Sequence, residues 1–101
     1  MRQGKILIVD DNIQVLESLK IVLKGEFHTV TTIKSPDHIP DLLSRHTYDV
    51  VLLDMNFETG ETSGTEGLKW LKRILSIDPL MVVILITAYG EIGLAVKAMK
   101  A

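Results

Sequence analysis

The sequence predicts an α/β domain with a doubly wound parallel sheet, and two observations lead to that prediction. Strand-like and helix-like segments alternate four times along the 101 residues, as they do in βα units around a parallel sheet. The run Asp49–Asp54 is apolar between its terminal carboxylates, and Leu80–Ile86 is apolar throughout. Such runs are typical of parallel strands covered on both faces. The length suits one domain, and no repeat or linker divides it.

Composition excludes several classes of function. The net charge of −2 gives no basic footprint for nucleic acid and no polybasic membrane signal. The chain has no cysteine, which excludes disulfides and thiolate chemistry and fits a reducing cytosol. The longest apolar run, Leu80–Ile86, is far shorter than the about 20 residues of a membrane-spanning helix. We expect a cytoplasmic protein with no signal peptide, no membrane partner and no direct nucleic-acid contact.

The first βα unit pairs a short strand with an amphipathic helix. Lys5–Val9 is apolar enough for a strand, and the pattern changes to a helical period over Ile13–Lys24. Asp11 or Asn12 is suited to cap the start of this helix, and Gly25 to end it. The predicted apolar face carries Leu16, Leu19 and Leu23, with Val15 and Val22 beside them.

The second unit begins with Phe27–Ile33, a Thr-rich strand that we expect at an edge of the sheet. Ser35 then precedes Pro36, the order of a cap and a first helical residue, so a helix is predicted from there to about His46. Pro40 falls late in the first turn of that helix, which predicts an irregular start.

The third and fourth units are separated by a helix that follows a long loop. The loop Met55–Glu66 is longer than the about 2–6 residues usual in α/β units. Loops of such length are more often functional or mobile. The helix Gly67–Ile77 follows, and Asp78-Pro79 ends it. Its predicted inward residues are Leu68, Leu71 and Leu75, its outward residues are Lys69, Lys72 and Arg73, and Trp70 is expected to be half-buried packing.

The last predicted helix starts near Gly90-Glu91 and runs to Ala101 without a stop signal. The apolar strand Leu80–Ile86 also needs cover on its far side. We therefore expect residues 1–101 to be one domain that is incomplete at its C-terminus.

Four polar side chains are predicted to meet where the strands end. Asp10 and Asp11 follow the first strand, Asp54 ends the third, and Thr87 follows the fourth. In open α/β sheets the reactive crevice lies beyond the carboxyl ends of the strands. Carboxylates that lie so close together repel one another unless a cation binds between them. Mg²⁺ is an ion that binds carboxylates and a phosphate at the same time.

This arrangement predicts phosphoryl chemistry on Asp54. A carboxylate nucleophile can attack a phosphoryl group and form an aspartyl phosphate. The Thr87 hydroxyl and the Ala88 backbone N–H would donate hydrogen bonds to the phosphoryl oxygens.

Simpler interpretations remain open at each position. Asp10 and Asp11 could serve only as helix caps, Asp54 could merely end a strand, and Thr87 could be a β-branched strand residue. His28, His38 and His46 lack ligand spacing, so they are predicted to be solvated side chains.

Three blocks of sequence resemble the receiver domains of two-component response regulators, in order and at the family's spacing. They are Ile6–Asn12, Val50–Met55 and Leu85–Gly90. The resemblance implies the flavodoxin-like (CheY-like) receiver fold with strand order 2-1-3-4. It implies that Asp10, Asp11, Asp54 and the Asn56 backbone carbonyl hold Mg²⁺, that Asp54 takes the phosphoryl group, and that Thr87 reports it.

The resemblance also implies partners and an output. A histidine kinase would supply the phosphoryl group, and the resulting conformational change would control a downstream, transcriptional output. Thr87–Gly90 and the tail Ala95–Ala101 are most similar to activators that work with an alternative sigma factor. The most enzymatic activity implied is Mg²⁺-dependent self-phosphorylation and autodephosphorylation on Asp54.

Departures from the family leave two alternatives. The loop after Asp54 is longer than usual and has Glu58 where the family has proline. The family's fifth strand, with its phosphate-binding lysine and switch aromatic, and its fifth helix would fall beyond Ala101. One alternative is therefore a phosphorylation-incompetent interaction module. The other, an aspartate-based phosphohydrolase, would need an acid where Asn56 stands. We also expect a homodimer or other self-association through the exposed edge of Leu80–Ile86.

Overall fold

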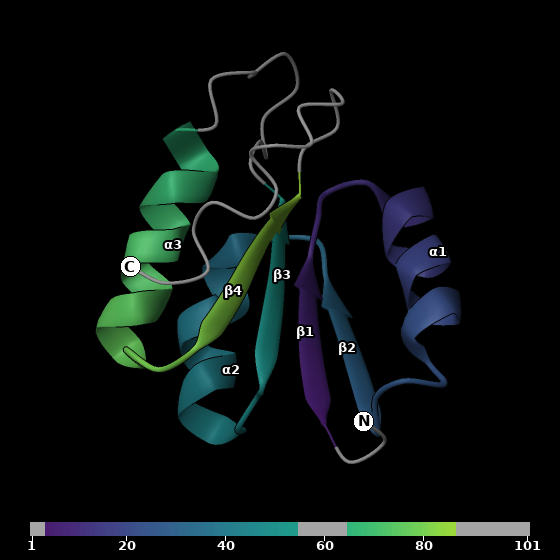
Figure 1. The fold of residues 1–101 in the computed structure, drawn as a ribbon. Helices are drawn as coiled ribbons and strands as arrows, with labels where there is room; N and C mark the ends of the chain where they lie inside the picture. Colours follow the sequence, from purple (N-terminus) through teal and green to yellow (C-terminus); the bar gives the residue numbers. More distant parts are fainter. Residues whose placement is uncertain (1–3, 55–64, 87–101) are drawn as a thin grey trace.

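A computed structural model describes residues 4–54 and 65–86, which are coloured in Figure 1. The elements are β1 (Lys5–Val9), α1 (Ile13–Leu23), β2 (Thr29–Ile33), the 3₁₀ turn η1 (Pro36–His38), α2 (Ile39–Arg45), β3 (Val50–Asp54), α3 (Thr65–Ile77) and β4 (Val82–Ile86). The helix predicted near Gly90-Glu91 lies outside the described residues, as does the loop after Asp54 up to residue 64.

The four strands form one parallel sheet in the order β2-β1-β3-β4. Both the doubly wound class and the order 2-1-3-4 are confirmed. β1 pairs with β2 on one side and with β3 on the other, and β3 pairs with β4. The two inner strands are the most buried, whereas every residue of β2 is only partly buried. That difference agrees with the predicted place of β2 at the edge.

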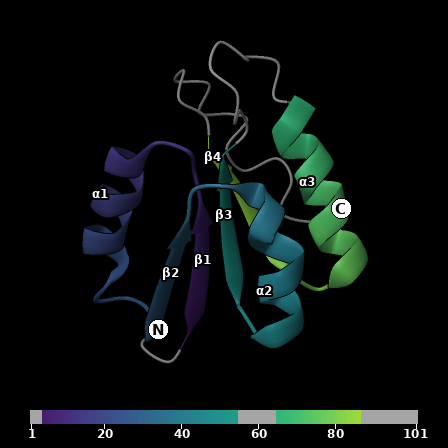
Figure 2. The ribbon, with the colours of Figure 1, turned by 180° about the vertical axis from the view of Figure 1, so that it is seen from behind.

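Helices cover both faces of the sheet, as Figures 1 and 2 show from opposite sides. α2 and α3 pack on one face over a cluster that includes Leu7, Val51 and Val83. α1 packs on the other face, where Leu16 is buried against Ile6 and Ile8. Alternate residues of β1 therefore enter different clusters, as the pleat of a strand requires.

Side-chain caps explain where α1 and the 3₁₀ turn η1 start. Asn12 Oδ1 accepts hydrogen bonds from the backbone N–H groups of Gln14 (2.9 Å) and Val15 (3.3 Å), so Asn12, and not Asp11, caps α1. Ser35 Oγ accepts a hydrogen bond from the N–H of Asp37 at 3.2 Å. The chain then makes a 3₁₀ turn before α2, whose first turn contains Pro40. The irregular start predicted for this helix is confirmed.

Two strands begin later than predicted because turns claim their first residues. Phe27, predicted to open β2, donates its N–H to the carbonyl of Leu23 and belongs to the turn that ends α1. Leu80, predicted to open β4, donates its N–H to Asp78 Oδ1 at 3.1 Å and is 90% exposed. Both predictions extended an apolar run into a turn whose hydrogen bonds the pattern does not reveal.

The buried face of α3 differs from the prediction. Leu68 was predicted to point inward but is 44% exposed, whereas Ile74 is fully buried and Leu71 nearly so. Leu68 lies six residues before Ile74, which places it about 120° away around a helix. Trp70 and Leu75 are half-buried against the core as predicted. On α1 the predicted inward residues Leu16, Leu19 and Leu23 do pack on the core, whereas Val22, predicted beside them, is 69% exposed.

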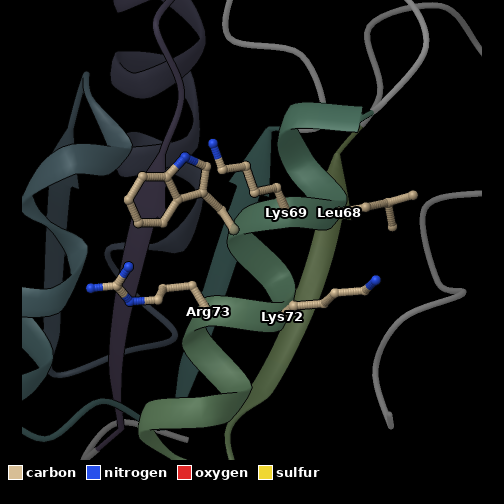
Figure 3. A pocket seen from close by; sticks show the side chains of 5 residues that line it. Leu68, Lys69, Lys72 and Arg73 are labelled. Atoms are coloured by element: carbon tan, nitrogen blue, oxygen red, sulfur yellow. The ribbon is translucent and has the colours of Figure 1, made fainter.

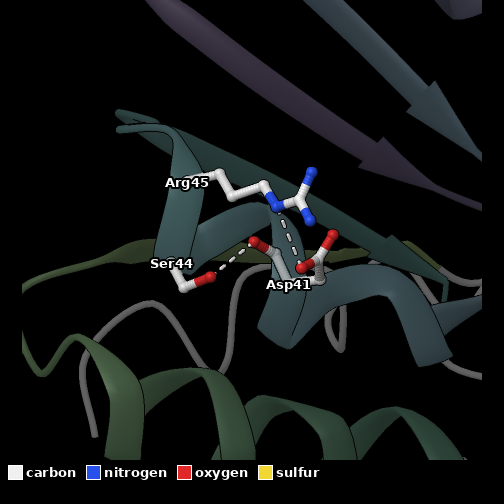
Figure 4. A network of polar contacts seen from close by, with 3 residues as sticks. All are labelled: Asp41, Ser44 and Arg45. Carbon is white, nitrogen blue, oxygen red and sulfur yellow. Dashed lines mark hydrogen bonds and ion pairs between the residues drawn. The ribbon is translucent and has the colours of Figure 1, made fainter.

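The surface of α2 carries a small polar network, shown in Figure 4. Arg45 Nε lies 3.1 Å from Asp41 Oδ1, one helical turn away, and Ser44 Oγ donates to the Asp41 carbonyl at 2.8 Å. Both charged side chains are mostly exposed, so the pair contributes little stability.

Within residues 4–54 and 65–86, no helix has the length and apolar character needed to cross a bilayer.

The corrected orientation of α3 can be tested by truncating two aliphatic side chains of the same helix. We expect Ile74→Ala to lower the free energy of unfolding by about 2–5 kcal/mol, because it opens a cavity in the core. Leu68→Ala should lower it by less than about 1 kcal/mol, because that side chain is largely in solvent. Urea unfolding followed by circular dichroism measures both. Equal losses would contradict the orientation described above.

Candidate functional site: three aspartates at the carboxyl edge of the sheet

The parallel pairing of β1 and β3 brings acidic residues together at one edge of the sheet. Asp10 directly follows β1, and Asp54 is the last residue of β3. Val9 lies opposite Leu53 in the register, so the next residue of each strand emerges at the same place. Carboxylate oxygens of Asp10, Asp11 and Asp54 all lie within 4.8 Å of one another. The structure thus gathers the three acids that the sequence placed at this edge, and we call them the acidic cluster.

The cluster is partly withdrawn from solvent. Asp10 is 5% exposed and Asp54 is 6% exposed, whereas Asp11 is exposed. Asp10 and Asp54 are the two buried charged or polar residues among those that the structure describes. Charged carboxylates are rarely buried unless they are paired or bind a metal. This burial distinguishes Asp10 and Asp54 from ordinary residues at strand ends.

Backbone hydrogen bonds hold Asp10 in place. Its N–H donates to the carbonyl of Ile33, at the end of β2, at 3.2 Å. Its Oδ1 accepts from the N–H of Asn12 at 2.9 Å. Asn12 uses its own side chain to cap α1, so neither aspartate serves as the helix cap. The simpler interpretation of these two acids as caps is therefore wrong.

The electrostatics of the cluster oppose ionisation of Asp10. Burial raises the pKa of Asp10 above its ordinary value of 3.8, and the neighbouring charge of Asp11 adds to the increase. The hydrogen bond from the Asn12 N–H lowers the pKa and offsets part of this effect. A divalent cation held between the carboxylates would favour their charged forms.

The acidic cluster is the one group of three metal-ligating side chains found among the described residues. His28, His38 and His46 are exposed and do not join it, as predicted. His28 Nδ1 lies 3.0 Å from Thr29 Oγ1, and the His46 ring contacts Tyr48 edge to face with centroids 6.3 Å apart.

The other predicted site residues, Asn56, Thr87 and Ala88, lie outside the described residues. Sequence analysis missed one contributor, the backbone N–H of Asn12 that orients Asp10. The spacing could have revealed it, because an aspartate commonly accepts a hydrogen bond from the N–H two residues ahead of it.

Comparison with protein families matches residues 6–101 to the response regulator receiver domain. The chain belongs to this family. The receiver domain is 34% identical to the alginate biosynthesis transcriptional regulatory protein AlgB of Pseudomonas aeruginosa over 100 residues, covering 99% of this chain and 21% of AlgB. It is 32% identical to the DNA-binding transcriptional regulator NtrC of Escherichia coli K12, covering 97% of this chain and 20% of NtrC. The chain thus spans about a fifth of the length of these curated relatives.

Solved structures agree with this assignment. A receiver domain of a response regulator from Bacteroides fragilis is 42% identical with a TM-score of 0.77, covering 94% of this chain and 74% of that one. The response regulator TrrA of Thermotoga maritima, solved in complex with Mg²⁺ and BeF, is 29% identical with a TM-score of 0.72, covering 87% of this chain and 72% of TrrA.

The raised pKa of Asp10 predicts a pH dependence of stability without divalent ions. The folded state holds the Asp10 proton more tightly than the unfolded state, so stability falls as pH rises from about 3.8 through the higher folded pKa. Asp10→Asn should therefore be more stable than the wild type at pH 7 in EDTA. The difference should disappear as the pH approaches 3.8.

Urea unfolding between pH 4 and pH 7 measures this difference. Asp37→Asn, which removes an exposed carboxylate outside the cluster, serves as the control and should show no such gain. A wild type that is as stable as Asp10→Asn at pH 7 would contradict the electrostatic account.

Proposed function

We propose that this receiver domain is a phosphoacceptor switch in which Asp54 takes a phosphoryl group from a histidine kinase. One observation carries the proposal: a nearly buried Asp54 lies within 4.8 Å of two other carboxylates, oxygen to oxygen, at the carboxyl edge of a parallel sheet. A solvated strand end needs no such convergence, whereas phosphoryl transfer to a carboxylate does.

The residues of the acidic cluster fit Mg²⁺. The donors are hard carboxylate oxygens of three side chains, two of which are buried, and burial raises the pKa of Asp10 in the absence of a cation. Asp10, Asp11 and Asp54 would hold the ion, with the Asn56 backbone carbonyl as a further proposed ligand. When bound, Mg²⁺ neutralises charge on the phosphoryl oxygens. The related TrrA was crystallised with Mg²⁺ and BeF, which supports the assignment.

The residues of the chain account for the transfer itself. An Asp54 carboxylate oxygen forms a bond to phosphorus while the bond from phosphorus to the kinase histidine nitrogen breaks, and the imidazole leaves. The β1–β3 ladder fixes the position of Asp54, so the nucleophile is oriented before the donor arrives. The Thr87 hydroxyl and the Ala88 N–H are the proposed donors to the phosphoryl oxygens, and movement of Thr87 would report the modification.

The output that we propose is control of transcription in the cytoplasm. AlgB and NtrC are both named as transcriptional regulators, and this chain covers about a fifth of each. A receiver of this kind would act by changing conformation and passing the change to another part of a longer protein.

Phosphorylation at Asp54 can be tested by mass spectrometry after treatment with acetyl phosphate. We expect one phosphoryl adduct on Asp54 with Mg²⁺, formed more than about tenfold more slowly in EDTA, because charge stabilisation by the metal is lost. Asp54→Asn should show no adduct.

Asp49→Asn is the matched control, because Asp49 immediately precedes the same strand and lies at its opposite end. Its Oδ2 accepts the N–H of Lys5 at 2.7 Å, and an asparagine keeps an oxygen acceptor. This variant should be phosphorylated like the wild type. An adduct that forms elsewhere, or that does not depend on Mg²⁺, would contradict the proposal.

We further propose that the chain self-associates through the outer edge of β4. In the described part of the sheet, β4 pairs on one side only, with β3. Near its start, Leu80 is 90% exposed and Val82 is 37% exposed. An apolar edge strand of this kind can pair with a strand of another molecule.

Sedimentation velocity over a range of concentrations tests this association. We expect concentration-dependent dimers in the wild type and a shift toward monomer in Val82→Lys, because a lysine on an edge strand opposes pairing. Val22→Lys, at an exposed position of α1, should leave the dimer unchanged. A monomeric wild type would overturn the proposal.

A further inference from the structure

The outer surface of α3 is strongly basic. Lys69, Lys72 and Arg73 fall within five residues, and no acidic residue occurs between Gly67 and Ile77. The chain as a whole has a net charge of −2, so this concentration of positive charge is local. We call Lys69, Lys72 and Arg73, together with Leu68 and Trp70, the α3 basic surface.

In the described part of the chain, no acidic side chain forms an ion pair with the three cations of this surface. The ion pair found there joins Arg45 to Asp41 on α2. Figure 3 shows Lys69 and Arg73 pointing to one side of the helix, and Leu68 and Lys72 to the other. Like charges spaced i, i+4, such as Lys69 and Arg73, repel each other and weaken a helix. An anionic partner would relieve that repulsion.

Apolar side chains lie among the charges. Leu68 is 44% exposed, and Trp70 is half-buried, with part of its ring packed against the core. All five residues border one open pocket on the surface of α3. An anchored tryptophan loses little freedom on binding, and tryptophan and arginine are the residue types that most often dominate binding energy at interfaces.

We propose that the α3 basic surface binds an acidic, amphipathic segment of a protein partner. The three cations would meet carboxylates, and Leu68 and Trp70 would meet the apolar side chains between them. A nucleic acid fits less well, because its continuous phosphate backbone calls for a longer basic footprint than three residues on a negatively charged chain. This inference rests on α3 alone and does not depend on phosphoryl transfer at Asp54.

The groove between α1 and β2 is a weaker candidate for such a partner. It has a volume of about 480 Å³, and its charged residues are of both signs: Glu17, Lys20 and Lys34. Mixed charge does not select an acidic partner, so the α3 basic surface carries the inference.

Trp70 is the one tryptophan of the chain, so its fluorescence reports directly on this surface. The probe is a synthetic helical peptide of about 15 residues with glutamates on one face and leucines on the other, lacking tryptophan and tyrosine. A reference peptide has glutamine at every glutamate position. We expect saturable changes in Trp70 emission with the acidic peptide, weakened by added salt, and none with the reference peptide.

Two triple variants separate this surface from general electrostatics. Neutralising Lys69, Lys72 and Arg73 to glutamine should weaken binding by about tenfold or more. Neutralising Lys20, Lys24 and Lys34 makes the same change in net charge elsewhere and should weaken it by less than about twofold. All six side chains are exposed, so both variants should fold, which circular dichroism verifies.

Three results would overturn the inference. One is equal binding of the glutamine peptide, which would mean apolar contact alone. Another is an equal loss in both triple variants, which would mean attraction by net charge. The third is tighter binding of a single-stranded DNA oligonucleotide than of the acidic peptide, which would mean a nucleic-acid surface. Because the titration uses neither a phosphoryl donor nor a metal, its failure would leave the phosphoacceptor proposal standing.

Discussion

The parallel ladder between β1 and β3 is the constraint on which the rest of the structure depends. Its residues point alternately into two separate cores, so a slip of one residue would exchange the two sets of side chains. The same register places Asp10 beside Asp54. Apolar packing on both faces of the sheet therefore holds like charges together at its edge, although those charges repel. The burial of apolar side chains in the two cores therefore stabilises a register that charge repulsion within the acidic cluster would oppose.

The sequence was sufficient to predict the doubly wound class and the convergence of three acids, because both follow from alternating apolar runs and from where those runs end. The order of the strands followed only from the resemblance to receiver domains. The sequence was less informative about which face of a helix is buried and about where each strand begins. Leu68 and Ile74 are equally apolar, and the helical period alone does not decide which of them faces the sheet. The starts of β2 and β4 depend on turn hydrogen bonds at Leu23 and Asp78, which no apolar pattern encodes. The proposed roles of Asn56, Thr87 and Ala88 concern residues that the structure does not describe.

The acidic cluster and the α3 basic surface place opposite charges on different parts of one small domain. The first is partly buried, with Asp10 held by backbone hydrogen bonds, and is suited to a small hard cation. The second is exposed, carries apolar side chains among its charges and suits a larger partner. Binding a cation and orienting a nucleophile require precisely placed side chains, as in the acidic cluster. Binding a protein partner requires a broad surface of complementary charge, as on α3.

In the loop between β1 and α1, charged side chains contribute to the acidic cluster and the neutral side chain of Asn12 caps the helix. Asn12 donates its backbone N–H to Asp10 and uses its amide oxygen to begin α1. Aspartate would begin a helix equally well, but it would add a fourth negative charge next to the three already gathered there. Asparagine therefore starts the helix without adding to the negative charge of the acidic cluster.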